Sequence, residues 1–263
     1  MTDKDGTLEI KDVKNANSTQ FWIPSLSLYM SDYYALTEDR WLSDSIIHAG
    51  QMMLKEAFPM IGGFQATTLG EVLAFEPETA EFVQILNVAS SHWITVSTIG
   101  CCFGEVNIFD SILHKDLPHR TKEQIASLLY SPLKKISLKF HPVQRQRGSN
   151  DCSLFALAFA TSLCNGTCPT AMSYTQKSMR THLLDCLVNH KMSVFPGRTR
   201  QPRVNEISVV HVYLVCKCRL PEEGNMAQCN LCNERFHQTC ESISDEVWMD
   251  SGDKWLCTAC SKY

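Results

Sequence analysis

Three side chains in this sequence could together carry out nucleophilic catalysis: Cys152, His92 and Asp110. A cysteine nucleophile needs a base that forms the thiolate and a group that orients this base. His92 begins an expected strand, and Asp110 directly follows another one, over 105–109. Cys152 begins an apolar helix over 152–164, and the N-terminus of a helix lowers the pKa of a thiol. The sequence therefore predicts a Cys–His–Asp constellation.

Each of these residues also has a structural alternative. A cysteine on an apolar helix is usually a small core residue, and a histidine or aspartate near a strand end usually lies in a solvated turn. We expect that structural role for four other cysteines: Cys101, Cys102, Cys164 and Cys186. One neighbour also opposes a thiolate, because Asp151 places a negative charge beside Cys152 unless it caps the helix.

Metal-binding chemistry is concentrated in the C-terminal segment, in seven cysteines and one histidine. They form four close pairs: Cys216 and Cys218, Cys229 and Cys232, His237 and Cys240, and Cys257 and Cys260. Ligand pairs at this spacing close on tetrahedral zinc. Eight ligands complete two tetrahedra and leave no open position for catalysis. The sequence therefore predicts two structural zinc ions, whose binding supplies the folding energy that so short a segment lacks.

The order of these ligands resembles that of PHD-type zinc fingers over about residues 213–263. A RING or another cross-braced finger is the alternative, but the single histidine in fifth place and Trp255, two residues before Cys257, favour a PHD finger. The resemblance implies that the pairs interleave. Cys216, Cys218, His237 and Cys240 would hold one zinc ion, and Cys229, Cys232, Cys257 and Cys260 would hold the other.

Many PHD fingers bind methylated histone lysine in a cage of aromatic rings that surround the cation. Here Met226 matches a frequent cage position, but Arg235 stands where the cage tryptophan usually sits, and Glu223 replaces another aromatic residue. The resemblance therefore implies weak reading of trimethyl-lysine. An unmodified histone tail, another chromatin protein or a purely structural role stay open for the finger.

Four short motifs earlier in the chain resemble those of ubiquitin-like-protein proteases of the Ulp/SENP kind. They are His92-Trp93, Asp110-Ser111, Gln146 six residues before Cys152, and the helix start Trp41-Leu42-Ser43-Asp44. The resemblance covers about residues 36–195. It implies an α+β, papain-like fold in which a helix carries Cys152 at its N-terminus and packs against a small mixed sheet that carries His92 and Asp110.

The same resemblance implies a catalytic role for each residue. Cys152 would be the nucleophile, His92 the general base and Asp110 the group that orients the base. Gln146 and the backbone N–H of Cys152 would line the oxyanion hole, and no cofactor would take part in catalysis. One departure is Ser153, where the family usually has glycine. A serine at a position that needs a positive φ would strain the backbone.

The implied substrate is the C-terminal Gly-Gly of a ubiquitin-like protein, with a SUMO-like protein as the first choice. Trp41 and Trp93 would form a narrow tunnel for this tail, and Asp44 would contact the substrate. Only residues without side chains pass between two indole faces, so the selection is steric.

The elements that must position these residues follow from hydrophobic periodicity and from helix and strand signals. We expect helices over 41–58, 121–130, 152–164 and 175–188. We expect strands over 81–88, 92–99, 105–109 and 135–141. The chain then divides into a flexible tail over 1–20, a protease-like domain over 21–195, a linker over 196–212 and the finger over 213–263.

Composition narrows the class of protein further. Hydrophobic residues make up 44% of 263 residues, which allows a packed core. A net charge of -4 and a pI of about 6.1 argue against direct nucleic-acid binding. The polar first residues lack a signal-peptide core, and no apolar stretch is long enough to span a membrane. We therefore expect an intracellular, reducing compartment, the nucleus before the cytoplasm, where thirteen cysteines serve as ligands and nucleophiles.

Two functions from different classes fit these residues. The first is a cysteine peptidase or isopeptidase whose finger targets it or docks a partner. The alternative is a catalytically impaired protease scaffold that acts as a chromatin-binding or protein-binding adaptor. A processing protease encoded by a mobile element is a further alternative. The intact set of nucleophile, base, orienting group and oxyanion donor favours the enzyme.

Overall fold

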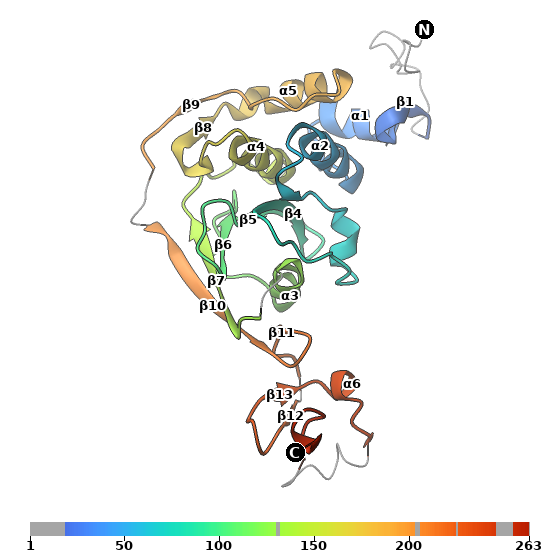
Figure 1. Ribbon diagram of the computed structural model, residues 1–263. Coiled ribbons are helices and arrows are strands. Elements are labelled where there is room, and N and C mark those ends of the chain that lie inside the picture. The colour runs from blue at the N-terminus through green and yellow to red at the C-terminus, as the bar shows by residue number, and fades with distance from the viewer. Residues whose placement is uncertain (1–18, 130–131, 203–205, 225, 246–254, 263) are drawn as a thin grey trace.

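The computed structural model describes residues 19–129, 132–202, 206–224, 226–245 and 255–262. Its centre is a seven-stranded sheet with helices on both faces, and the cysteine-rich segment extends from one end (Figure 1). The strand order is β11, β10, β7, β6, β5, β4, β3. These strands are β3 (Gly62–Gly63), β4 (Phe82–Val88), β5 (His92–Ser97), β6 (Glu105–Phe109), β7 (Lys135–His141), β10 (Ser208–Val215) and β11 (Leu220–Pro221).

Strand pairing makes the sheet mixed. β4 and β6 each pair antiparallel with β5, while β3 is parallel to β4 and β6 is parallel to β7. A parallel pair needs a crossover connection, and here α3 (His119–Leu128) supplies it between β6 and β7. β5 is buried at every position, because side chains from both helical layers cover it.

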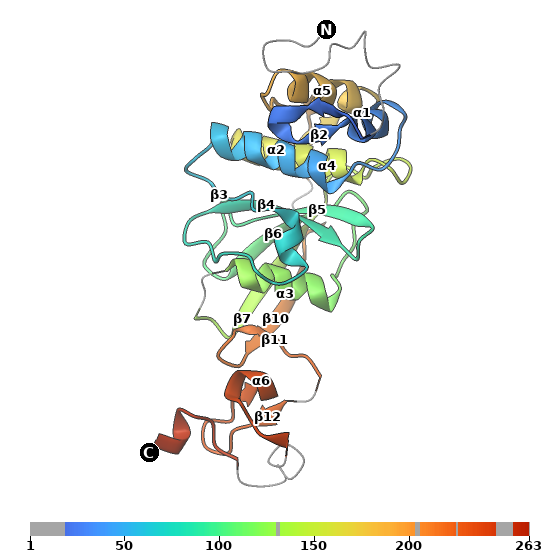
Figure 2. The ribbon, with the colours of Figure 1, turned by 90° about the vertical axis from the view of Figure 1, so that its right-hand side faces the viewer.

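The helices form layers on the two faces of the sheet. α2 (Asp44–Ala57) and α4 (Cys152–Cys164) cover one face and α3 covers the other, while α1 (Met30–Thr37) and α5 (Gln176–Val188) lie beyond α2 and α4 (Figure 2). Two apolar clusters fill the spaces between sheet and helices. α4 is buried along its whole length and packs on β4 and β5. The expected α+β fold, with a helix that begins at Cys152 against a mixed sheet, is confirmed.

Local signals explain where the elements begin. The helix expected over 41–58 begins at Asp44, because the Ser43 hydroxyl accepts the backbone N–H of Ile46 at 3.4 Å and caps it. The expected strands correspond to β4, β5, β6 and β7 within two residues. Near the N-terminus, β1 (Phe21–Ile23) pairs with β2 (Leu28–Tyr29). Within the described residues, every helix is too short or too polar to cross a bilayer.

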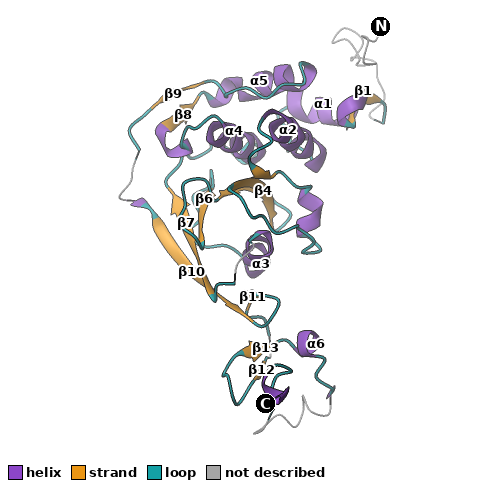
Figure 3. Cartoon of the chain, in the orientation of Figure 1, coloured by secondary structure: helices purple, strands orange, loops and turns teal. Residues whose placement is uncertain are grey.

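Part of the linker expected over 196–212 is in fact strand (Figure 3). β9 (Gly197–Thr199) pairs with β8 (Met172–Tyr174), and β10 joins the main sheet by antiparallel pairing with β7. The physical reason is the run of β-branched residues in β10, which buries Val212 and Leu214 against the sheet. The limits of the domains stay a prediction.

The cysteine-rich segment begins at Cys216, directly after β10, and contains little regular structure. It contains β11, which pairs with β10, and then β12 (Ala227–Gln228), β13 (Arg235–Phe236), α6 (Gln238–Glu241) and a 3-10 turn (Cys260–Lys262). Its small core consists of Phe236 and cysteines, with the Trp255 ring 5.6 Å from that of Phe236. So few apolar contacts do not stabilise a fold alone, and a bound metal is the usual remedy.

Candidate active site and zinc centres

Three elements bring the predicted catalytic residues together. Cys152 is the first residue of α4, which packs on β5, and His92 is the first residue of β5. Asp110 directly follows β6. Antiparallel pairing of Thr95 with Phe109 places the end of β6 beside the beginning of β5. The fold thus collects one residue from each element at the same edge of the sheet.

A short hydrogen bond joins His92 to Asp110. His92 Nε2 lies 2.6 Å from Asp110 Oδ1, and the two side chains are 6% and 3% exposed. Asp110 also accepts the backbone N–H groups of Ile112 at 2.8 Å and His114 at 3.1 Å, and its Oδ2 lies 2.7 Å from His114 Nδ1. These bonds fix the carboxylate, which in turn orients the His92 ring.

The surroundings of His92 favour its protonated form. Burial lowers the pKa of His92, but hydrogen bonds to Asp110 and Cys152 and the charges of both outweigh it and raise the pKa to about 9. Burial raises the pKa of Asp110, but its bonds to His92 and to backbone N–H groups lower it below its usual value. His92 Nδ1 is buried, and within the described residues it has no hydrogen-bond partner apart from its interaction with Cys152. This nitrogen therefore stays available to the thiol of Cys152.

Gln146 is held against the turn that follows Asp110. Its backbone N–H donates to the Ser111 carbonyl at 2.9 Å, and its Oε1 accepts the Ser111 hydroxyl at 2.6 Å. Its Nε2 donates to the Gly148 carbonyl at 3.0 Å. An amide nitrogen carries two hydrogens, so one remains for an oxyanion. The Gly148 carbonyl can only accept, so it fixes the position of the amide nitrogen, and the Ser111 hydroxyl donates to the amide oxygen.

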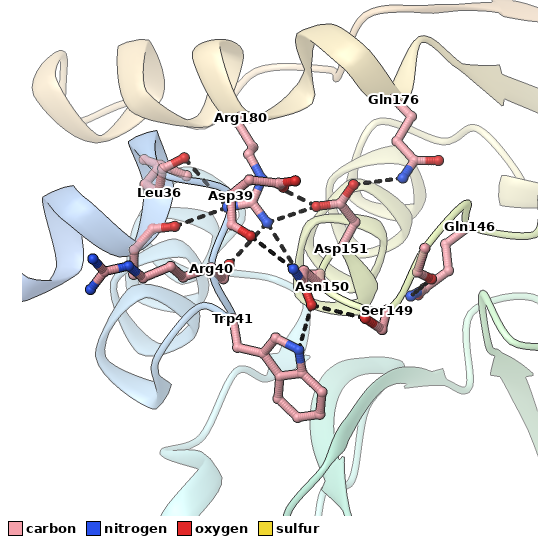
Figure 4. Close-up of polar contacts among 12 residues, drawn as sticks. Leu36, Asp39, Arg40, Trp41, Gln146, Ser149, Asn150, Asp151, Gln176 and Arg180 are labelled. Atoms are coloured by element: carbon pink, nitrogen blue, oxygen red, sulfur yellow. Dashed lines mark hydrogen bonds and ion pairs between the residues drawn. The ribbon is translucent and has the colours of Figure 1, made fainter.

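The structure answers two questions that the sequence left open about the residues beside Cys152. Ser153 lies inside α4 and has no positive φ, so the serine causes no backbone strain. Asp151 is the N-cap residue of α4, but its side chain does not cap the helix. Its carboxylate instead accepts hydrogen bonds from Arg180 at 2.7 Å and Gln176 at 2.6 Å, both from α5 (Figure 4). The negative charge is therefore offset from outside α4.

The predicted substrate-binding residues lie in three different settings. Trp41 is half-exposed, and its Nε1 donates to Asn150 Oδ1 at 2.6 Å, which ties it to the segment before the nucleophile (Figure 4). Trp93 is 5% exposed and packs in the same apolar cluster as Cys152. Asp44 is the exposed first residue of α2. A tunnel between the two indoles and a substrate contact of Asp44 stay predictions.

Four residues that hold this site had no role assigned to them from the sequence, although Ser111 was already part of the Asp110-Ser111 motif. Ser111 and His114 lie in the turn after Asp110 and bind Gln146 and Asp110. Asn150 and Arg180 connect segments more than 100 residues apart in the chain. The spacing of four residues between His114 and Asp110 was a visible signal, but no local pattern reveals the long-range contacts of Asn150 and Arg180.

The eight predicted metal ligands form two groups in space. Within each group the ligand atoms lie within 4.8 Å of one another: Cys216, Cys218, His237 and Cys240, and Cys229, Cys232, Cys257 and Cys260. His237 Nδ1 lies 3.4 Å from Cys218 Sγ and 3.9 Å from Cys240 Sγ. Three thiolates with one imidazole, and four thiolates, are donor sets that suit structural zinc. The residues therefore fit this metal in an interleaved arrangement.

The three positions compared with an aromatic cage contain no aromatic ring. Met226 packs against the small core of the finger. Arg235 is exposed and forms an ion pair with Glu222, and Glu223 is exposed. None of these three side chains offers a ring face to a cation.

Comparison with known proteins agrees with both parts of this description. Residues 215–260 match the family model of the PHD-finger. The structure resembles the C-terminal protease domain of Ulp1 in complex with Smt3, the yeast ortholog of SUMO, with 13% identity and a TM-score of 0.51 over 72% of this chain and 98% of that one. It also resembles SUMO protease Ulp1 with the catalytic cysteine oxidised to a sulfonic acid, with 13% identity and a TM-score of 0.51 over 70% and 97%. No curated protein matches the chain in sequence.

These similarities define the class of protein. The chain combines the fold of Ulp1-type SUMO proteases with a C-terminal PHD finger. Identity as low as 13% establishes the shared fold, and the chemistry must be argued from the side chains of this chain.

Proposed function

We propose that this chain is a cysteine peptidase and isopeptidase that cleaves after the C-terminal Gly-Gly of a SUMO-type ubiquitin-like protein. One observation carries the proposal: a buried histidine next to Cys152 is bonded to Asp110 at 2.6 Å and has its pKa raised to about 9. A thiol beside an imidazole that a carboxylate orients is the machinery of cysteine peptidases. The Ulp1-like fold supports the substrate class.

In the proposed reaction, His92 Nδ1 takes the thiol proton of Cys152. The thiolate attacks the carbonyl carbon of the terminal glycine, and the C=O electron pair moves to the oxygen. Gln146 Nε2–H and the backbone N–H of Cys152 donate to this oxyanion. When the C–N bond breaks, the amine leaves with the proton from His92. Water then attacks the thioester, His92 takes a proton from this water, and the thiol is restored as the carboxylate product leaves.

Selection in this proposal comes from the space beside the nucleophile. Trp41 presents a half-exposed indole and is tied by Asn150 to the segment before Cys152. A glycine pair passes such a face because it lacks side chains. Branched residues before the scissile bond should therefore be rejected at the cleavage step.

The PHD finger, in this proposal, holds two structural zinc ions and docks a partner, such as an unmodified histone tail or another chromatin protein. The two groups of four donors support this number of ions. The proposal places the protein in the nucleus, where such partners reside. Metal analysis of reduced, freshly purified protein tests the zinc content, and the expected value is two per chain.

Cleavage of model substrates tests the enzyme directly. SUMO-type, ubiquitin and other ubiquitin-like precursors with a C-terminal extension would be incubated with the protein under reducing conditions. We expect cleavage after Gly-Gly in at least one SUMO-type precursor, and no cleavage with Cys152→Ala, which should still bind the substrate. Absence of cleavage in every precursor would leave the adaptor as the function.

A further inference from the structure

We propose that Arg180 of α5 is a positioning residue that holds the segment before Cys152 and the segment with Trp41 in one arrangement. This rests on the proposed function, because it concerns how that site is assembled. The Arg180 side chain is only 15% exposed and reaches from α5 into the space between the two segments (Figure 4). No periodic signal in the sequence points to this residue.

On the side of the nucleophile, Arg180 binds the last two residues before Cys152. Its Nε and Nη2 donate to Asp151 Oδ1 at 3.1 and 2.7 Å, and Nη2 also donates to the Asn150 carbonyl at 3.2 Å. Gln176, one turn earlier on α5, donates to the second oxygen of Asp151 at 2.6 Å. α5 thus holds both the backbone and the carboxylate at the start of α4.

On the opposite side, Arg180 binds the end of α1 and the segment that leads to Trp41. Nη1 donates to the carbonyls of Ala35 at 3.0 Å and Leu36 at 3.4 Å, and Nη2 donates to the carbonyl of Arg40 at 2.9 Å. The last carbonyls of a helix have no partner within the helix, so the guanidinium caps α1. Nε also lies 2.9 Å from Asp39 Oδ1.

A direct bridge links the two segments that Arg180 holds. Asn150 Oδ1 accepts the Trp41 indole N–H at 2.6 Å, and Asn150 Nδ2 donates to the Asp39 carbonyl at 2.8 Å. Arg180 fixes the backbone on both sides of this bridge. The distance between the Trp41 indole and Cys152 therefore depends on Arg180, which acts through the backbone of both segments and through Asp151.

Two contributions of Arg180 can be separated by substitution. Its charge offsets Asp151 beside the nucleophile, and a lysine would keep this contribution. Its planar fork donates in several directions at once, which a lysine ammonium on a flexible chain does not reproduce. If positioning is the main role, Arg180→Lys should retain a reactive thiol and lose the correct placement of Trp41.

The test compares Arg180→Lys and Arg180→Gln with the control Arg120→Lys. Arg120 on α3 also pairs with a carboxylate, that of Glu123 at 3.0 Å, and with a backbone carbonyl, but on the other face of the sheet. Alkylation of Cys152 by iodoacetamide reports the thiol without substrate recognition. The kcat and KM on a SUMO-type fusion report the assembled site.

We expect Arg180→Lys to alkylate within about twofold of wild type and to raise KM about tenfold with a smaller change in kcat. Arg180→Gln should slow alkylation as well, because Asp151 is then uncompensated. The control should match wild type. An unchanged KM in Arg180→Lys would overturn the proposal. An alkylation rate that falls by the same factor as KM rises would also overturn it.

Amide hydrogen exchange tests the positioning role of Arg180 without relying on the enzyme reaction. In Arg180→Lys, amides of residues 38–41 and 149–151 should exchange faster, while those of β5 should not change. If the wild-type protein cleaves nothing, this measurement still decides whether Arg180 positions the segments. Should the Arg180 variants fail to fold, Asn150→Ala removes the bridge alone and should raise KM with normal alkylation. Unchanged exchange and an unchanged KM would overturn the proposal.

Discussion

Burial and hydrogen bonding shift the pKa of His92 in opposite directions. The resulting pKa sets the pH range in which the proposed reaction should run. Burial lowers the pKa of the ring, while Asp110 and Cys152 together raise it to about 9. The leaving amine needs a proton from His92, so turnover should fall as the pH rises through about 9. The same group affects stability. Its folded pKa is above the unfolded value of about 6.5, so its contribution is complete below that pH and is lost towards pH 9.

Asp110→Asn tests this balance. Without the carboxylate, burial should dominate and the pKa of His92 should fall, so the alkaline limb of kcat/KM should move to lower pH. Turnover should decrease less than in His92→Ala, because an amide can still accept a hydrogen bond from the ring. The measurement is kcat/KM between pH 5 and 10 for both variants. An alkaline limb that stays near pH 9 in Asp110→Asn would contradict this account of His92.

Ser153 provides a matched pair of substitutions. Its fully buried hydroxyl has no hydrogen-bond partner within the described residues, and such a group costs about 1–3 kcal/mol. Ser153→Ala should therefore raise the free energy of unfolding by about 1 kcal/mol. Ser153→Gly should raise it much less, because glycine is unfavourable in a helix. Denaturant unfolding of both variants measures the difference. A marked rise in turnover with Ser153→Gly would show that the serine strains the site after all.

At the scale of elements, β10 decides where the protease-like fold ends and the finger begins. β10 pairs with β7 through Tyr213 and passes directly into Cys216, the first of the predicted zinc ligands. Chelation of zinc should therefore unfold the chain from Cys216 onwards, while β10 stays paired with β7. Hydrogen exchange with and without a chelator measures the boundary. Loss of protection along the whole of β10 would show that its pairing depends on the finger.

Some helices and strands could be predicted from the sequence, and others could not. Strands β4 to β7 and helix α4 were predictable, because each has a clear apolar pattern. The predicted catalytic residues lie at the ends of such elements, so the fold accounts for their meeting at one end of the sheet. β10 was missed because it follows a segment rich in proline and arginine. The contacts of Arg180 were not predictable, since they join residues about 140 positions apart.

For the whole molecule, the proposed function assigns partner binding to the finger and catalysis to the Ulp1-like part. The three positions compared with a methyl-lysine cage hold Met226, Glu223 and Arg235, none of which is aromatic. Met226 packs against the core of the finger, and Arg235 forms an ion pair with Glu222. We therefore expect less than about a tenfold preference, or 1.4 kcal/mol, for trimethylated over unmodified histone lysine. Calorimetric titration with both peptides measures this preference. A larger one would mean that other residues build a cage.

One measurement tests the central claim most directly, which is that Cys152 attacks the C-terminal glycine of a ubiquitin-like protein. The wild-type protein would be treated with propargylamide probes of SUMO-type proteins, ubiquitin and other modifiers, and the modified residue would be located by mass spectrometry. We expect a covalent adduct at Cys152 with a SUMO-type probe, a lower yield with ubiquitin, and no adduct with Cys152→Ala or after Cys152 is alkylated. Adducts with none of the probes, in a protein whose zinc finger and fold are intact, would contradict the claim.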